Sequence, residues 1–135
     1  MPKIFTSKTQ KIGEMGENIA IKFLVKHGFS LLERNYTKKW GEIDIVAEKD
    51  KKLHFIEVKS VSCETLTKVI HKTDNYRPED NVHPWKMKRL SRTIQTFLLD
   101  RKIGEGKEWQ FDLLVIYLCQ KEKKAKVKVV SDIIL

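Results

Sequence analysis

The chain has 135 residues, which suits one domain with a sizeable hydrophobic core and excludes a large multidomain protein. Lys and Arg total 27 against 18 Asp and Glu, so the formal net charge is +9 at pH 7. A balance this basic favours a polyanionic partner, nucleic acid before a membrane surface, although a merely solvated basic surface also accounts for it.

Cysteine content and hydropathy indicate where the protein works. Cys63 and Cys119 are too few for a zinc site and indicate no disulfide framework. The first residues lack the apolar core of a signal peptide, and the longest apolar run, residues 113–119, is too short to cross a bilayer. We therefore expect a soluble cytoplasmic protein that makes no membrane contact.

The first elements in the chain are predicted to be a helix and three strands. Residues 13–27 form the helix and Gly28 ends it. Its apolar positions recur at helical spacing: Ile12, Met15, Ile19, Ala20, Phe23 and Leu24. A short strand is expected over residues 29–35. Two β-rich segments follow, 42–48 and 53–61, joined by a polar turn.

The second half begins with a polar segment, residues 62–82, which predicts a long mobile loop beside the functional site. Pro84 opens a second helix that runs to about Asp100, with a core stripe of Met87, Leu90, Ile94, Phe97 and Leu98. Residues 111–119 predict a strand buried on both faces, and residues 125–134 an edge strand. The order αβββαββ predicts a single α/β domain over residues 1–135, with a central mixed β-sheet flanked by helices.

Carboxylates interrupt the apolar hairpin at residues 41–60. If the turn is centred between residues 50 and 51, Asp44 lies opposite Glu57, and Glu42 opposite Lys59, all on one face. Directly opposed carboxylates destabilise a hairpin unless something neutralises them. With a backbone carbonyl such as that of Val58, they form an oxygen site suited to Mg²⁺ or Mn²⁺. A charge-balanced ladder on a solvated face is the alternative, and a register slip would change every pairing.

An Asp followed at a distance by Glu-x-Lys at a strand end, here GEID at 41–44 and EVK at 57–59, resembles the PD-(D/E)xK nuclease superfamily. Within it the chain resembles the YraN family of bacterial proteins, which are similar to archaeal Holliday junction resolvases. The resemblance is carried by GEMGENIAIKFL (13–24), ERNYTKKWGEIDIVA (33–47), HFIEVKS (54–60), VHPWKMKRL (82–90) and QFDLLVI (110–116). It therefore covers most of the chain and implies a restriction-endonuclease-like fold.

Roles for individual residues follow from this resemblance. It implies that Asp44 and Glu57 bind the metal and that Lys59 orients the attacking water or steadies the phosphate charge. It also implies that Glu17 assists from the first helix. Glu17 lies at the margin of the apolar arc, from which it can reach inward; a helix-start acid favoured by the helix dipole is the alternative. The implied reaction is metal-dependent hydrolysis of DNA, leaving a 5′-phosphate.

The sequence departs from the family pattern at two places. Ser60 and Val61 follow Glu-x-Lys where many relatives have Thr-Arg, and Gln110 stands where an Arg commonly precedes Phe-Asp. Both changes remove expected phosphate contacts. They therefore bear on substrate binding more than on metal binding.

The second helix has a basic aromatic face. Trp85, Arg89 and Arg92 share that face with Lys88 close by, and Lys86 falls at the edge of the apolar arc, from which it can lean toward the hairpin carboxylates. Tryptophan beside arginine suits base stacking and phosphate contact. A Trp that only closes the helix start, within a solvated basic face, is the alternative.

Three functions remain open on the sequence alone. The first is a magnesium-dependent endonuclease acting on DNA, with branched DNA among the substrates considered. The second is a noncatalytic nucleic-acid-binding protein that retains the fold, and the third is a protein-protein platform. A homodimer also stays open.

Overall fold

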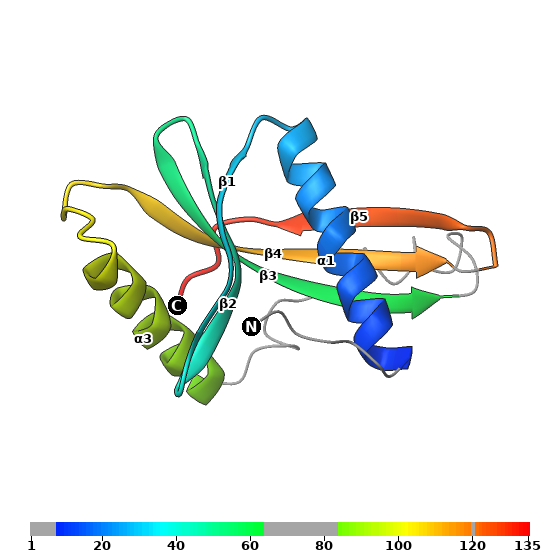
Figure 1. Ribbon diagram of the computed structural model, residues 1–135, viewed down its shortest axis with the longest axis horizontal. Helices are drawn as coiled ribbons and strands as arrows, with labels where there is room; N and C mark the ends of the chain where they lie inside the picture. Colours follow the sequence, from blue (N-terminus) through cyan, green and yellow to red (C-terminus); the bar gives the residue numbers. More distant parts are fainter. Residues whose placement is uncertain (1–7, 64–83, 120) are drawn as a thin grey trace.

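The structure is a computed structural model that describes residues 8–63, 84–119 and 121–135 (Figure 1). In chain order its elements are α1 (Lys8–Lys26), β1 (Ser30–Lys38), β2 (Gly41–Lys49), β3 (Lys52–Cys63), α3 (Pro84–Asp100), β4 (Trp109–Cys119) and β5 (Lys124–Val130). Within these described residues the predicted order αβββαββ is confirmed. Most of the loop expected over 62–82 lies outside the described residues, although residues 62 and 63 belong to β3.

The five strands form one mixed sheet in the order β1-β2-β3-β4-β5. β3 and β4 pair in parallel through eleven residue pairs, from Leu53–Trp109 to Cys63–Cys119, and the other neighbours are antiparallel. The fold is thus the single α/β domain with a mixed sheet that the sequence predicts. In Figure 1, β1 and β2 are steeply inclined to β3, β4 and β5, so the sheet twists strongly at its centre.

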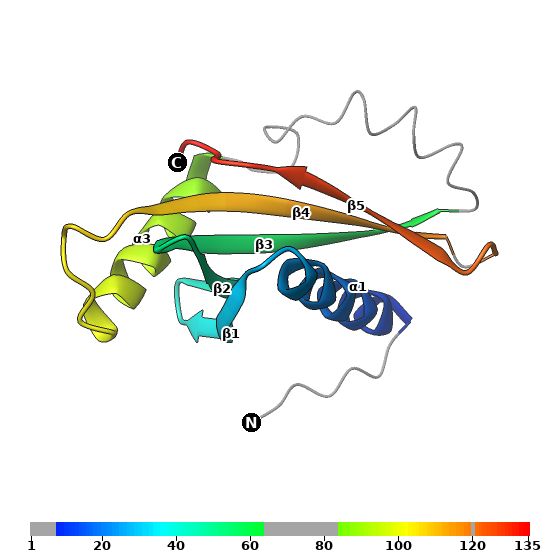
Figure 2. The same ribbon diagram turned by 90° about the horizontal axis from the view of Figure 1, so that it is seen from above.

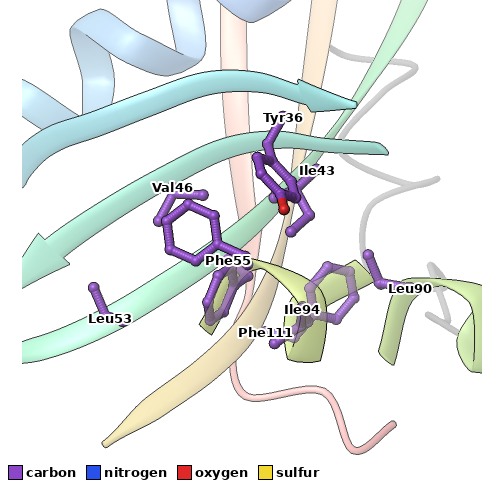
Figure 3. Close-up of a cluster of buried hydrophobic side chains, with 9 residues drawn as sticks. Tyr36, Ile43, Val46, Leu53, Phe55, Leu90, Ile94 and Phe111 are labelled. Atoms are coloured by element: carbon purple, nitrogen blue, oxygen red, sulfur yellow. The ribbon is translucent and has the colours of Figure 1, made fainter. Parts of the chain in front are cut away.

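Helices α1 and α3 cover opposite faces of this sheet (Figure 2). Successive side chains of a strand point to opposite faces, and in β3 Phe55 packs toward α3 while Ile56 packs toward α1. The α3-side core, drawn in Figure 3, contains Tyr36, Ile43, Val46, Leu53, Phe55, Leu90, Ile94, Phe97 and Phe111. β4 lies between β3 and β5, and its residues 111–119 are all buried, as predicted.

The helix boundaries follow from ordinary signals. α1 ends before Gly28, whose φ of +87° is the left-handed conformation that glycine adopts readily at a helix end. Met15 was expected in the α1 core, but its side chain is 48% exposed, because Ala20 and Leu24 face the sheet and Met15 lies beyond the margin of that stripe. β5 ends at Val130, earlier than the expected residue 134.

The β2–β3 hairpin has the predicted turn. Asp50 and Lys51 both have positive φ, 51° and 63°, as a two-residue type I′ connection requires. The predicted register holds from Lys49–Lys52 to Ile45–Ile56, where the ladder ends. The expected pairings of Asp44 with Glu57 and of Glu42 with Lys59 are therefore wrong. Beyond Ile45, β2 turns away with β1, and β3 continues beside β4.

Two further expectations concern the chemistry and hydropathy of the chain. Cys63 and Cys119 occupy partner positions at the ends of β3 and β4, and Cys119 is disulfide-bonded, so the expectation of no disulfide is wrong. Neither α1 nor α3, the helices of the described segments, is long and apolar enough to span a membrane.

Candidate functional site

Strands β2 and β3 separate beyond the pair Ile45–Ile56, and we call this point the fork. Asp44 and Glu57 lie near each other there. Asp44 is the first β2 residue beyond the last β2–β3 pair. Its Oδ2 accepts a hydrogen bond from the backbone N–H of Val58 at 2.8 Å. The carboxylate therefore receives a β3 donor at the place where the β2 backbone has left the ladder. This bond fixes Asp44 against the continuing strand.

The position of Asp44 disfavours its charged form. Burial raises the pKa of the Asp44 carboxyl from 3.8 to about 7, the hydrogen bond from Val58 opposes this, and the negative charges of Glu57, Glu17 and Glu42 add to it. Three other carboxyl groups thus lie close enough to act on Asp44. A perturbed acid in a concave position is characteristic of a functional site and needs a cation or a proton to offset its cost.

Glu57 is only half satisfied. Its Oε1 accepts a hydrogen bond from Lys86 Nζ at 2.6 Å, whereas its Oε2 is buried and has no hydrogen-bond partner among the described residues. Lys86 therefore does lean toward the hairpin carboxylates, as predicted from its place on the helix. Trp40 Nε1 is the other buried side-chain atom without a hydrogen-bond partner in the described segments. Buried polar atoms are rarely left unpaired, so each of the two calls for an explanation.

Two cavities meet at this fork. One, of about 500 Å³, lies between α1 and the strands, and Glu17, Asn35 and Lys59 contribute to its wall. The other, of about 370 Å³, lies between β2 and α3, and both residues with an unpaired atom, Trp40 and Glu57, line it. We call these the α1-side cavity and the α3-side cavity. Glu42 and Asp44 line both.

Glu17 and Asn35 form the α1 side of the site. Glu17 Oε1 accepts from Arg34 Nε at 2.8 Å, which joins α1 to β1. Asn35 has a φ of 56°, and with its amide nitrogen turned toward the acids it donates to Glu17 and Glu42, each at 3.2 Å. The structure thus brings Glu17 to the site, as the resemblance implied.

The basic groups lie on both sides. Lys59 lines the α1-side cavity and forms no ion pair with the described residues, whereas Lys86 and Arg89 line the α3-side cavity. Arg89 Nε donates to the Trp40 carbonyl at 3.0 Å, and the Arg92 guanidinium lies 4.2 Å from the centre of the Trp40 ring. Sequence reasoning did not assign Trp40, although its place directly before GEID is the signal that could have found it.

Two positions that the sequence connects with nucleic-acid binding, Gln110 and Lys88, do not line either cavity. Gln110 lies away from both cavities: its Nε2 donates to Asp112 Oδ1 at 2.6 Å, and the other oxygen of this buried carboxylate contacts His54 Nδ1 at 2.7 Å. The loss of an Arg at position 110 therefore does not alter either cavity wall. Lys88 lies exposed on α3 and lines neither cavity.

The donor set suits a divalent cation in its chemistry. Asp44 and Glu57 supply carboxylate oxygens, the ligands that such a cation prefers. Burial and the nearby acids disfavour a negative charge on Asp44, and a cation would offset this. Glu57 Oε2 has no hydrogen-bond partner among the described residues. Across residues 8–63, 84–119 and 121–135, however, no three His, Cys, Asp or Glu side chains converge closely enough to hold an ion. The described side chains therefore offer two carboxylates to a cation, and Lys86 already neutralises one oxygen of Glu57.

The fold and these side chains define a basic α/β domain with a nuclease-like architecture. The chain belongs to the uncharacterised protein family UPF0102, whose model matches residues 16–116. It is 38% identical to a UPF0102 protein of Campylobacter hominis over 124 residues, 92% of this chain and 96% of the relative. It is also 39% identical to a UPF0102 protein of Campylobacter lari over 105 residues, 78% and 82% of the two chains. The match with the family confirms the resemblance seen in the sequence.

Proposed function

We propose that this protein is a metal-dependent endonuclease that hydrolyses phosphodiester bonds of DNA. The observation that carries the proposal is the fork at which β2 and β3 separate. There a half-buried Asp44, whose pKa is raised to about 7, lies near Glu57, which has a buried oxygen without a partner among the described residues, and lysines stand on both sides. Acidic oxygens beside cationic groups suit a site that binds a metal and a phosphate together.

In this proposal the ligands of Mg²⁺ or Mn²⁺ would be the carboxylates of Asp44 and Glu57 and the carbonyl of Val58. When bound, the metal would lower the pKa of a water molecule and offset negative charge on the phosphate. Lys59, on the α1-side wall, contacts the phosphate or orients the water. Glu17, fixed by Arg34, keeps negative charge on that wall. Lys86 balances the charge of Glu57 until a cation replaces it.

A noncatalytic nucleic-acid-binding protein is the second candidate. The ion pair of Lys86 with Glu57, at 2.6 Å, favours it because a lysine already neutralises one proposed ligand. In that case the basic groups of α3 would bind the nucleic acid backbone, and the carboxylates would serve only the fold.

A cleavage assay separates these candidates. Branched, nicked, linear and single-stranded DNAs are incubated with Mg²⁺ or Mn²⁺ and either the natural chain, Asp44→Asn or Asp50→Asn. Asp50 is the matched control, because it is an exposed aspartate in the turn of the same hairpin. Even groups that only support a metal ligand typically contribute 10–100-fold, so loss of a ligand should reduce cleavage by on the order of 100-fold or more, and Asp50→Asn should cleave normally.

The binding result completes the test. If the natural chain binds these DNAs but cleaves none with either metal, the second candidate replaces the first. Equal cleavage by the natural chain and Asp44→Asn would refute the metal site outright.

A further inference from the structure

The α3-side cavity contains features that the proposed hydrolysis does not use. Asp44 and Glu57 line it, and so do the tryptophans Trp40 and Trp85 and the cation Arg89. Its volume of about 370 Å³ is within the usual range of small-ligand pockets, about 300–1,000 Å³. A metal ion and a phosphate would not need two indole rings.

Trp85 presents its ring at the start of α3. The residue is 57% exposed, which leaves apolar surface in contact with water in a cavity that Asp44 and Glu57 also line. The Arg89 guanidinium lies 5.5 Å from the centre of the Trp85 ring, one helical turn further on. The aromatic surface and a positive charge are therefore offered together from one helix face.

Arg89 is itself held in place. Its Nε donates to the carbonyl of Trp40 at 3.0 Å, and no carboxylate among the described residues forms an ion pair with it. Thr93 and Gly41 explain how α3 comes this close: a Cβ on Gly41 would lie 2.4 Å from Thr93 Oγ1 and 3.4 Å from the Arg89 carbonyl. The glycine of GEID thus allows α3 to approach β2, which brings Arg89 and Trp85 over the fork.

A ligand that suits this wall has a flat face for Trp85 and a negative charge for Arg89 and Lys86. A nucleotide with an unpaired base has both, and a stacked base contributes about 1–3 kcal/mol without reading its sequence. A base inside an intact duplex cannot present its face, and duplex phosphates alone need only the cations.

We propose that the α3-side cavity binds an unpaired nucleobase of the DNA, stacked on Trp85 with its phosphate against Arg89. The substrate class is then DNA with unpaired nucleotides next to the bond that is cut, rather than perfect duplex. This rests on the proposed function in one respect: the stacked nucleotide neighbours the phosphate at Asp44 and Glu57.

Binding is measured in EDTA, so that cleavage plays no part. Three DNA probes of equal length are compared by fluorescence anisotropy: a single strand, a duplex with one unpaired 2-aminopurine, and the perfect duplex. The natural chain should bind the first two more tightly than the third, by roughly 5- to 150-fold if one base stacks. The 2-aminopurine emission should fall on binding, as stacking quenches it.

Variants assign the effect to Trp85. Trp85→Ala should lose the preference and the quenching while keeping its affinity for the perfect duplex, and Trp85→Phe should retain most of both. Leu99→Ala is the matched control, because Leu99 is an apolar α3 residue that is 79% exposed and lies outside the cavity. Melting temperatures establish that each variant is folded.

The outcomes distinguish this inference from the proposed function. Equal affinity of the natural chain for all three probes, or an equal loss by Trp85→Ala on all of them, overturns the inference whatever the cleavage assay shows. A preference lost only in Trp85→Ala supports it even if no metal ion produces cleavage, in which case the proposed hydrolysis alone fails.

Discussion

At Asp44 the requirements of folding and of the proposed chemistry conflict. A carboxyl group that would be ionised in water at neutral pH lies half-buried near three other acids, and the donor that offsets this is the backbone N–H of Val58. Burial and like charges both favour its protonated form. The empty fold therefore becomes less stable as this group ionises.

The first prediction concerns the pH dependence of stability in EDTA. Because the folded-state pKa of Asp44 is about 7 against an ordinary 3.8, the folded chain binds this proton more tightly, and the resulting stabilisation is lost as pH rises from about 4 through 7. The loss is on the order of 4 kcal/mol. Asp44→Asn avoids it, so its melting temperature should exceed that of the natural chain by a margin that grows across this range and then levels off.

Thermal denaturation at several pH values measures this margin. As the control, Asp50→Asn should differ from the natural chain in melting temperature by an amount that does not change with pH.

Adding Mn²⁺ at neutral pH should raise the melting temperature of the natural chain in proportion to the logarithm of the Mn²⁺ concentration and do little for Asp44→Asn. If Asp44→Asn melts clearly lower without metal and Mn²⁺ shifts neither protein, the carboxylates form a structural ladder.

Sequence reasoning identified the acids and the lysine of α3 because strand alternation and helical periodicity are local rules. It paired Asp44 with Glu57 wrongly, because the end of a ladder depends on which neighbour each strand keeps, and β3 keeps β4, 56 positions further along the chain. Trp40 was missed for the same reason. Its position matters only once α3 packs beside β2.

At the scale of elements, close approach of α1 to β3 depends on Gly16. A Cβ at this position would lie 1.8 Å from Ser60 Oγ and 2.9 Å from Ser60 Cβ. The hydroxyl can rotate away, but the Cβ cannot, so helix and strand would have to separate. This contact aligns Glu17, the next residue, with the fork.

The second prediction is that Gly16→Ala destabilises the fold. Overpacking typically costs about 1–3 kcal/mol, which should exceed the gain of up to about 1 kcal/mol from replacing a helical glycine. Gly13→Ala is the matched control on the same helix, because a Cβ added there would meet nothing within 4 Å, so it should be slightly stabilising. Urea denaturation of both variants compares them. Stabilisation of similar size in both would show that α1 does not pack this tightly.

The sequence predicts which helices and strands form, but not the residues at which the strands end. Periodicity located both helices and all five strands of the described segments, and the two positive φ values at residues 50 and 51 agree with the predicted turn centre. The extension of β3 to Cys63 depends on pairing with β4, which lies far along the chain, whereas β1 reaches Lys38 by pairing with β2 across a tight turn. Local composition carries no signal for the distant pairing, so a polar residue such as Ser62 resembles a loop residue in the sequence alone.

At the scale of the whole molecule, the charge of +9 is expected to govern binding to DNA. Contacts to phosphates release counterions, so affinity falls log-linearly with salt, by about 0.9 in slope per phosphate contacted on duplex DNA. The basic face of α3 and the lysines of β5 both contribute to this charge, and they lie at different parts of the sheet.

The third prediction separates the two surfaces. Replacing Arg89 and Arg92 together by Ala should reduce the salt slope by roughly 2, whereas replacing Lys124 and Lys126 removes the same charge from the edge strand β5 and should leave the slope nearly unchanged. Fluorescence anisotropy across a salt series gives both slopes. The same reduction in the two double variants would mean that only total charge matters.

The parallel pairing of β3 with β4 also sets the order of events during synthesis. The acidic residues and Lys59 have all been made by residue 59, but the ladder that holds their strand ends at Cys119. At about 5–20 residues per second, roughly 3–12 s separate the two points. During that interval the nascent chain carries every proposed metal ligand without the sheet that positions them. The strand that carries Glu57 and Lys59 can thus be fully paired only after residue 119 has been added, so the proposed hydrolysis should not begin before that point in synthesis.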